Sequence, residues 1–429
     1  MKRQITLNSK LLPVLVGLLL VMQLIDPSRV WSTLLVGLGG AWLFSYYWAR
    51  VLSNQLSLRR EMRFGWAQVG DRLEERFTIT NQGNLPAIWI ELEDHSNLPD
   101  YFPDRVTGVG SRSKNTWRTE GICTRRGLFN IGPTSLRTGD PLGLYSVYLH
   151  DPACVSVMVM PPVVSLPLIE VAPAGRSGEG RPRPNAPEPT VSVATVRPYQ
   201  SGDALRWIHW RTSARKDDLF VKLFDNTPSS DWWILLDMDK RVQVGEGQDS
   251  TQEHSVVLAA SLADRGLKLN HAVGLVAGGE SLVWLSPREG SERRWEILRA
   301  LALVTPGEYS LAELLVRMKP AIGQRASLVI ITPNLSGDWL EGLLPFIWRG
   351  SVPTVLLLDP VSFGGEPGTA GLLAALTDLG IARYVIKREL LDRPESRPGH
   401  AGKWEWKVTA TGRAIPVQKP RNMEWKELS

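Results

Sequence analysis

The chain has 429 residues, of which 43% are hydrophobic and 22% charged, and its formal net charge is +5. This composition suits a folded protein of two or three domains. The charge does not indicate nucleic-acid binding, which needs basic residues concentrated on one face, but it suits a protein beside an anionic membrane leaflet. Two cysteines, Cys123 and Cys154, exclude a disulfide framework, while one bridge or two free thiols both remain open.

Two apolar runs at the start of the chain predict a transmembrane α-hairpin over residues 1–52. The runs cover residues 11–25 and 30–49, and the polar stretch 26–29 separates them. At about 1.5 Å per residue, each run approaches or reaches the hydrocarbon thickness of a bilayer. A signal peptide is the alternative for the first run, because basic residues precede it, but no small-residue cleavage site follows.

Basic residues around the two runs indicate an orientation. Lys2, Arg3 and Lys10 precede the first run and several arginines follow the second, whereas the turn holds only Arg29. The positive-inside rule therefore places both termini and the soluble domains in the cytoplasm. We expect a two-pass protein of the inner or plasma membrane, in contact with the lipid bilayer.

Residues 60–162 consist of short alternating runs bounded by turn residues. Strands are expected at residues 73–80, 87–94 and 154–160. Several short strands at this spacing predict a β-sandwich of immunoglobulin-like character. Residues 163–196 are rich in proline, glycine and arginine and are predicted to be a connector.

Residues 197–225 are the most informative segment, because arginines alternate there with tryptophan, tyrosine and histidine. A solvated face would not need so many aromatic side chains, and a core would not accept so many unpaired guanidinium groups. We therefore predict a polar constellation that is either an internal network or a binding surface. The candidate interaction residues are Arg197, Tyr199, Gly202, Asp203, Arg206, His209, Trp210, Ser213 and Arg215.

The rest of the chain alternates apolar strands with helices. Strands are expected at 231–237, 271–277, 327–332, 352–359 and 383–386, with helices at 253–265, 292–304, 310–318, 338–348 and 369–380. This order is typical of an α/β domain with a mostly parallel, doubly wound sheet. We assign residues 197–395 to this domain, and they include the segment 197–225. The tail, 396–429, is predicted to be at most an edge strand or an interaction peptide.

No catalytic site emerges from the residue patterns. His209, Asp203 and Ser213 could form a nucleophilic triad, but Ser213 would lie within a helix, without a strained turn or an oxyanion hole. The sequence has no Gly-x-x-x-x-Gly-Lys phosphate loop and no Cys/His cluster suited to zinc. We therefore expect no catalytic residue and no cofactor.

The same segment resembles the bacterial family called domain of unknown function 58. The resemblance rests on Arg-Pro-Tyr-Gln-x-Gly-Asp from position 197, then Arg206, Ile208, Trp210, Ser213-Ala214-Arg215 and Leu219-Phe220-Val221-Lys222-x-Phe224. It implies a multidomain protein with a transmembrane α-hairpin, an immunoglobulin-like β-sandwich and an α/β doubly wound domain similar to von Willebrand factor A. It also implies operation with a MoxR-type AAA+ ATPase.

A domain similar to von Willebrand factor A would carry the motif Asp-x-Ser-x-Ser, whose oxygens hold a magnesium ion. Asp237 matches the aspartate here, but Asp239 and Arg241 replace the two serines. Lys240 and Arg241 would repel a cation, so no metal is expected, and Asp237 and Asp239 are weak candidate ligands. Their other expected role is to anchor arginines of residues 197–225.

Three functions remain open. The first is a membrane-anchored cytoplasmic adaptor or assembly factor of unknown biochemical activity that works with a MoxR-type AAA+ ATPase. The alternative is a binding module for an anionic ligand, such as a lipid headgroup, nucleotide or cell-wall precursor, held by Arg206, Arg211 and Arg215. The third is an enzyme of unrecognised type. No nucleic-acid partner is expected.

Overall fold

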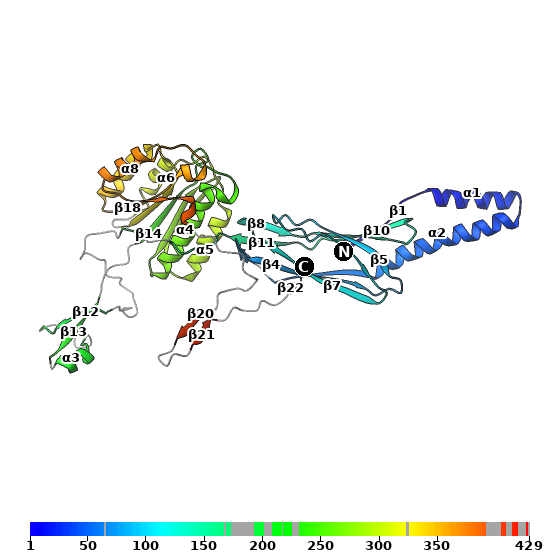
Figure 1. Cartoon of the computed structure of the whole chain (residues 1–429), viewed down its shortest axis with the longest axis horizontal. Helices are drawn as coiled ribbons and strands as arrows, with labels where there is room; N and C mark the ends of the chain where they lie inside the picture. The colour runs from blue at the N-terminus through cyan, green and yellow to red at the C-terminus, as the bar shows by residue number, and fades with distance from the viewer. Residues whose placement is uncertain are drawn as a thin grey trace. The chain divides into compact units, whose positions relative to one another are not determined.

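The computed structural model describes residues 1–63, 66–166, 169–172, 193–200, 208–216, 218–224, 231–322, 326–391, 405–408, 414–418 and 426–427. The chain divides into two compact units. The first comprises Met1–Val164, Leu298–Leu303 and Asp392–Ser429, and the second comprises Ser165–Ile297 and Val304–Leu391. The predicted hairpin, residues 1–52, and the predicted sandwich, residues 60–162, thus lie in one unit (Figure 1).

The first unit begins with a helical hairpin of α1 (Leu11–Ile25) and α2 (Arg29–Gln55). The Ser28 hydroxyl accepts a hydrogen bond from the backbone N–H of Trp31 and caps α2. Both helices extend beyond the sheets in Figure 1. The last turns of α2 do not: Trp48, Ala49 and Leu52 belong to the core of the sandwich.

The predicted hairpin is therefore present, but its transmembrane character is not supported. No helix among the described residues is both long enough and apolar enough to cross a membrane. The 15 residues of α1 extend over about 22 Å, less than the roughly 30 Å of bilayer hydrocarbon. The longer α2 places much of its second half in the protein core.

Two sheets form most of the sandwich. The five-stranded sheet has the order β1-β10-β9-β5-β6, with bounds Lys2–Leu7, Tyr145–Asp151, Thr134–Gly139, Ala87–Asp94 and Arg105–Val109. The four-stranded sheet has the order β22-β2-β4-β7, with bounds Lys426–Glu427, Leu56–Met62, Arg72–Asn81 and Ser113–Ile122. Alternate residues of β4 are buried, as expected for a strand with one face on a core.

Smaller sheets complete the first unit. The order β3-β11-β8 joins Trp66–Gln68, Val155–Met160 and Gly127–Ile131. In the tail, β20 (Glu405–Val408) and β21 (Ala414–Gln418) form a two-stranded sheet. The expected β-sheet domain is thus confirmed. The sequence did not indicate β1, since its basic residues were assigned to the flank of the hairpin.

The second unit contains a six-stranded sheet of order β16-β15-β14-β17-β18-β19. The strands in that order are Leu282–Arg288, Val273–Gly278, Trp232–Asp237, Ser327–Thr332, Val352–Leu358 and Ala382–Ile386. All are parallel except the edge strand β16. Every residue of the three central strands is buried, which explains their continuous apolar sequences.

Helices pack on this sheet. The α-helices are α4 (Thr251–Lys268), α5 (Ser291–Leu303), α6 (Leu311–Met318), α7 (Leu344–Trp348) and α8 (Thr369–Asp378). The 3-10 helices are η2 (Gly247–Asp249), η3 (Asp338–Leu343), η4 (Pro360–Phe363) and η5 (Arg388–Leu390). One core cluster joins Trp233 and Leu235 of the sheet to residues of α6, α7 and α8. The predicted α/β domain is confirmed.

The described residues between 193 and 224 form a small element. Strands β12 (Val193–Pro198) and β13 (Phe220–Phe224) pair antiparallel, and α3 (Trp210–Lys216) lies between them in sequence. This element therefore presents the helix at the end of a two-stranded sheet.

Candidate functional site

The strand order of the α/β unit creates a switch point beside β14. From β14 the chain continues to β15 on one side, and β17 later pairs with the other side of β14. In open α/β sheets, ligand sites lie where the connections diverge, at the carboxyl ends of the strands. Asp237 ends β14 and Thr332 ends β17, so both stand at this edge.

Asp237 is fully buried at the switch point. Its Oδ2 accepts a hydrogen bond of 2.6 Å from the Thr332 hydroxyl, and its Oδ1 accepts one of 3.1 Å from the Asp239 N–H. Burial raises the pKa of Asp237 to about 6, although these two hydrogen bonds oppose the shift. The carboxyl group therefore titrates much closer to neutral pH than an exposed aspartate.

Asp239 is held by Arg241, two residues further along the chain. The Arg241 Nε lies 2.9 Å and 3.1 Å from the two Asp239 oxygens, and Nη2 lies 2.6 Å from Oδ2. Burial alone would raise the pKa of Asp239, but the hydrogen bonds and charge of Arg241 outweigh it and lower the pKa. Arg241 itself is 60% exposed.

A loop after α5 closes against the same edge. The backbone of Gly307 accepts from Lys240 N–H and donates to Met238 O, both at 2.9 Å. A Cβ on Gly307 would lie 2.1 Å from the carbonyl of Gly279, so this close approach requires glycine. The loop thereby brings Glu308 into an ion pair with Lys240.

Side chains after β17 form the neighbouring part of the edge. Asn334 Oδ1 accepts hydrogen bonds from the N–H and hydroxyl of Ser336, at 2.8 Å and 2.7 Å. Ser336 also contacts Asp338, which opens η3. Their position directly after β17 could have placed these side chains beside Asp237 from the sequence alone. The carboxyl ends of adjacent parallel strands meet at one edge of a sheet.

Neighbouring groups already occupy the oxygens of the two candidate metal ligands at this edge. Both oxygens of Asp239 already face Arg241, and those of Asp237 face Thr332 and a backbone N–H. Within the described ranges, no group of three His, Cys, Asp or Glu side chains suits a metal ion. The arginine that holds Asp239 comes from the same loop rather than from residues 197–225.

The structure describes six of the nine candidate interaction residues. Arg197 lies in β12 opposite Val221, and Tyr199 donates its N–H to Leu219 O. Trp210 begins α3 and is 68% exposed. Arg215, near the end of α3, is exposed. Gly202, Asp203 and Arg206 lie outside the described residues.

His209 and Ser213 have structural roles around α3. The Ser213 hydroxyl is buried and accepts a hydrogen bond of 2.9 Å from the N–H of Phe220. The His209 Nδ1 lies 2.7 Å from the Thr212 hydroxyl. The hydrogen bond to Ser213 holds α3 against β13, and the Ser213 oxygen is its acceptor.

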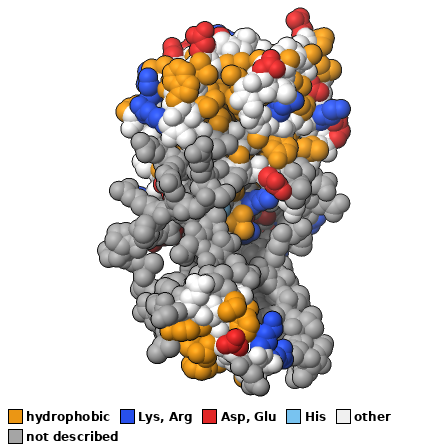
Figure 2. Space-filling model, turned by 90° about the vertical axis from the view of Figure 1, so that its left-hand side faces the viewer, with side chains coloured by type: hydrophobic (Ala, Val, Ile, Leu, Met, Phe, Trp, Pro, Cys, Tyr) orange, Lys and Arg blue, Asp and Glu red, His pale blue; other side chains and the backbone are white. Residues whose placement is uncertain are grey.

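The exposed surface of α3 is basic. Arg211, Arg215 and Lys216 are all exposed, and the Lys216 ammonium lies 5.1 Å from the centre of the Phe220 ring. Figure 2 shows the surface from one side, with hydrophobic and charged side chains mixed over the α/β unit. A basic and aromatic helix face is chemically suited to an anionic group.

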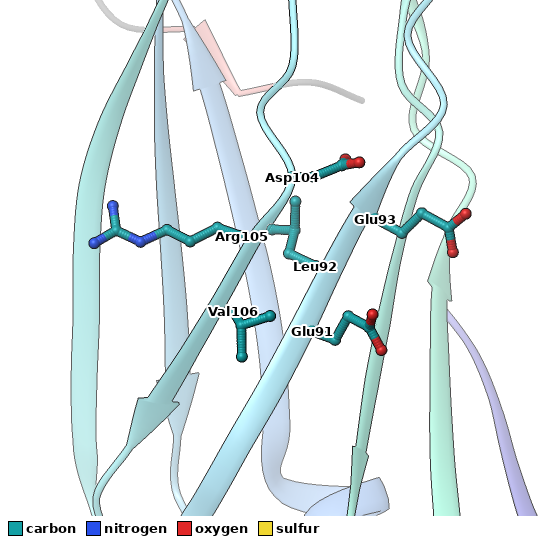
Figure 3. A pocket seen from close by; sticks show the side chains of 6 residues that line it. All are labelled: Glu91, Leu92, Glu93, Asp104, Arg105 and Val106. Atoms are coloured by element: carbon teal, nitrogen blue, oxygen red, sulfur yellow. The ribbon is translucent and has the colours of Figure 1, made fainter.

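A hollow in the first unit carries charge but no assembled site. In Figure 3 its lining comes from β5, from the start of β6 and from the residue before β6, namely Glu91, Leu92, Glu93, Asp104, Arg105 and Val106. Asp104 accepts a hydrogen bond from the backbone N–H of Asp94, and Glu91 lies 3.5 Å from Arg137. These side chains serve contacts within the sandwich.

A buried ionic cluster in the sandwich escaped the sequence reasoning. Arg60 donates to Glu75 at 3.0 Å and 2.7 Å and to Asp94 at 2.5 Å. Tyr101 donates its phenol hydrogen to Glu75. Burial raises the pKa of Glu75, against the opposing effect of Arg60, and also raises that of Tyr101. No local motif signals this cluster, because Glu75 and Asp94 are 15 and 34 residues from Arg60.

Relatives of this chain are known by sequence. It is 25% identical over 310 residues to the uncharacterized protein YeaD of Bacillus subtilis, covering 69% of this chain and 74% of YeaD. It is 23% identical over 180 residues to the uncharacterized protein Rv1480 of Mycobacterium tuberculosis, covering 41% of this chain and 57% of Rv1480.

Two solved structures align with parts of this chain at low scores. A von Willebrand factor type A protein from Catenulispora acidiphila aligns with 12% identity and a TM-score of 0.25, covering 37% of this chain and 39% of that one. An aerotolerance-related membrane protein from Bacteroides fragilis aligns with 14% identity and a TM-score of 0.21, covering 44% and 81%.

The family match covers the segment that carried the resemblance. Residues 195–362 match the family described as "Protein of unknown function DUF58". The match includes α3 and the strands β14 to β18. It therefore includes Asp237 and Thr332, which end the two strands at the switch point. The resemblance that residues 197–225 indicated is thus confirmed by a family match over residues 195–362.

Proposed function

We propose that this protein is a membrane-associated cytoplasmic adaptor or assembly factor whose α/β unit binds a partner protein without a bridging metal ion. The observation that carries the proposal is the Asp239–Arg241 pair. Arg241 is 60% exposed, yet three close contacts to a buried carboxylate hold it. A guanidinium fixed in one orientation loses little freedom when it donates to a partner.

The surroundings of Arg241 favour a protein surface as the ligand. Lys240 and Glu308 form an exposed ion pair beside it, so both signs of charge are present at the edge. Mixed charges of this kind select a partner with the complementary pattern, and they contribute mainly to specificity and association rate. The partner that we propose is a MoxR-type AAA+ ATPase, as the resemblance of residues 197–225 implies.

The helical hairpin supports the membrane part of the proposal. Along α1, Leu11, Val14, Leu18, Leu24 and Ile25 are each more than half exposed, and no charged residue occurs in the helix. A continuous exposed apolar surface marks a membrane or protein contact. We propose that this surface enters the cytoplasmic leaflet while the sheets remain in the cytoplasm.

The test is purification of the full-length protein from its own membranes in mild detergent, followed by mass spectrometry of the proteins bound to it. We expect a MoxR-type ATPase, retained in EDTA and reduced at least tenfold by Arg241→Glu. Arg383→Glu, which changes an exposed arginine on β19, is the matched control. Release of the ATPase by EDTA, or equal recovery with Arg241→Glu, would contradict the proposal.

A second candidate function, binding of an anionic ligand, is favoured by the basic face of α3. Arg211 and Arg215 lie one helical turn apart and are both exposed. Stabilisation by inorganic phosphate or a nucleotide that disappears in Arg211→Gln/Arg215→Gln would support this function. If phosphate and nucleotides changed the melting temperature of neither the wild type nor the double variant, this function would be contradicted.

A further inference from the structure

One turn of the sandwich, residues 140–144, lies beside the start of α1. Asn8, three residues before that helix, donates two hydrogen bonds to carbonyl groups of the turn, of 2.8 Å and 3.0 Å. Within the turn, the buried Asp140 carboxylate accepts the N–H of Leu142 at 2.9 Å. The Leu142 side chain is nevertheless 56% exposed. The turn thus holds an apolar side chain outward in a fixed position next to the hairpin.

Two further turns lie beside the end of α2. Gln82 donates its N–H to the carbonyl of Gln55, the last residue of α2, at 3.1 Å. A Cβ on the next residue, Gly83, would lie 2.9 Å from the side chain of Val51. The turn between β6 and β7 contacts the same segment, since Arg112 donates its N–H to Gly83 O at 3.0 Å. Both turns therefore stand at the end of the sandwich from which the hairpin extends (Figure 1).

Arg112 has a backbone conformation that arginine rarely adopts. Its φ of 49° lies in the left-handed region, which is unfavourable for a residue with a side chain other than asparagine or aspartate. A hydrogen bond of 3.0 Å from its Nη2 to Asn84 Oδ1 ties the guanidinium to the neighbouring turn. The fold of this turn would be better served by glycine. An exposed arginine at such a position indicates a use for its charge outside the sandwich.

The segments at the hairpin base expose basic side chains. These segments are residues 8–10, 82–86, 110–114 and 140–144. Their exposed charged residues are Lys10, Arg112 and Lys114. Their one acidic residue, Asp140, is 2% exposed and accepts hydrogen bonds from backbone N–H groups. An apolar tip next to several cations is suited to the surface of a bilayer that contains anionic lipid.

We propose that these turns are a second lipid contact, which docks the hairpin end of the sandwich on anionic phospholipid headgroups. Lys10, Arg112 and Lys114 face the headgroup phosphates, and Leu142 reaches the boundary of the acyl chains. This contact rests on the membrane part of the proposed function, because the hairpin brings the turns to the leaflet. It adds a lipid class and an orientation, since turns beside both helices hold the sandwich upright on the membrane.

The test compares binding of the full-length protein to vesicles of phosphatidylcholine with binding to vesicles that also contain phosphatidylglycerol, by flotation at increasing lipid concentration. The variants are Arg112→Glu and Arg112→Gly. The matched control is Arg125→Glu, which reverses an exposed arginine beyond the other end of β7. The ten residues of β7 span about 33 Å, so this control lies far from the hairpin base.

We expect a loss of affinity that is confined to the anionic vesicles. A basic residue beside an anionic leaflet contributes about fivefold to binding, so Arg112→Gly should bind about fivefold and Arg112→Glu about 25-fold more weakly than the wild type. Arg125→Glu should bind like the wild type, and all four proteins should bind equally to phosphatidylcholine. The melting temperature of Arg112→Gly should be no lower than that of the wild type, because glycine adopts this φ without strain.

Two failures can be told apart. Equal binding of Arg112→Glu and Arg125→Glu to the anionic vesicles would overturn the second lipid contact and leave the hairpin contact intact. A wild type that bound neither kind of vesicle would contradict the membrane part of the proposed function itself.

Hydrogen exchange of the full-length protein in nanodiscs of the same two compositions locates the contact. Phosphatidylglycerol should slow exchange in residues 110–114 and 140–144 and leave residues 123–126 unchanged. Unchanged exchange in both of the first two segments would overturn the proposal.

Discussion

Arg60 shows how one buried charge organises the sandwich. Its side chain is 2% exposed and faces two carboxylates, those of Glu75 and Asp94. Thr134 also accepts from it at 2.8 Å, and the Phe77 ring lies 4.9 Å from its guanidinium carbon. Without the guanidinium, two like charges would remain buried next to each other.

We therefore expect Arg60→Met to lower the free energy of unfolding of the first unit by about 3–5 kcal/mol. Adding Glu75→Gln and Asp94→Asn should recover at least half of that loss, because the orphaned charges then disappear. Urea unfolding at neutral pH measures both values. If the triple variant were no more stable than Arg60→Met, the loss would come from packing and not from the buried charges.

Asp237 predicts a pH dependence of the second unit. Its folded pKa of about 6 lies above the ordinary value of 3.8, so the folded state binds the proton more tightly than the unfolded state. Stability from this group is therefore full below about pH 4 and falls as the pH rises through 6, by at most about 3 kcal/mol.

The variant Asp237→Asn should remove this contribution. Its stability relative to the wild type should rise between pH 4.5 and 7.5, by about 1–3 kcal/mol. Urea midpoints of the two proteins at both pH values give the difference, and other titrating groups cancel in it. A difference that stays constant with pH would mean that Asp237 keeps an ordinary pKa.

At this scale the sequence predicted part of the site. The spacing of Asp237, Asp239 and Arg241 after an apolar strand located the edge correctly. It did not predict the pairing, because the contact of Arg241 with Asp239 depends on the turn that follows β14. The cluster around Arg60 joins strands of different sheets and has no signal in local sequence.

At the scale of elements, apolar periodicity predicted most of the α/β unit. The strand at 327–332 has the same bounds as β17, and the helix expected at 253–265 lies within α4. The helix expected at 338–348 is instead η3 followed by α7, because Pro345 can stand only in the first turn of a helix. The edge strand β16 was missed, since it contains Pro287 and is only half-buried.

The apolar surface of the hairpin predicts lipid binding that point substitutions can remove. Leu18, Val21 and Val36 are 53%, 49% and 74% exposed, so lysine at these positions should leave the helices folded. The triple lysine variant should lose at least tenfold of its binding to vesicles of anionic lipid in a flotation assay, because burying an ammonium in hydrocarbon is unfavourable.

Lysine at Ile88, which is 57% exposed on β5, provides the control and should leave vesicle binding unchanged. Unchanged flotation of the triple variant would assign membrane contact to another part of the chain. Loss of flotation in both variants would point to a general effect of surface charge. Deleting residues 1–50 is a poorer test, since it would also remove β1 and the buried turns of α2.

At the scale of the whole molecule, the division into two units predicts independent energetics. Arg60 lies in the first unit and Asp237 in the second, and among the described residues their hydrogen-bond partners differ. The stability changes of Arg60→Met and Asp237→Asn should therefore add in the double variant within about 0.5 kcal/mol. A coupling above about 1 kcal/mol in urea unfolding would show that the units unfold together.

The sequence separated the hairpin from the sandwich, whereas the structure joins them. The reason is the pairing of β1 with β10, in which Ile5 lies opposite Val147 although the two residues are far apart in sequence. Pairings between residues so far apart are invisible to local patterns. The same holds for β22, whose two residues carry no strand signal of their own.

The pairing of β1 with β10 also sets an order of events during synthesis on the ribosome. Strand β1 is made first, but β10 is completed only at Asp151, about a hundred residues after the end of α2. At roughly 5–20 residues per second, the apolar helices emerge about 5–20 s before the strand that tethers their leading end exists. During this interval the nascent hairpin lacks the pairing of β1 with β10 that later holds it to the sheet.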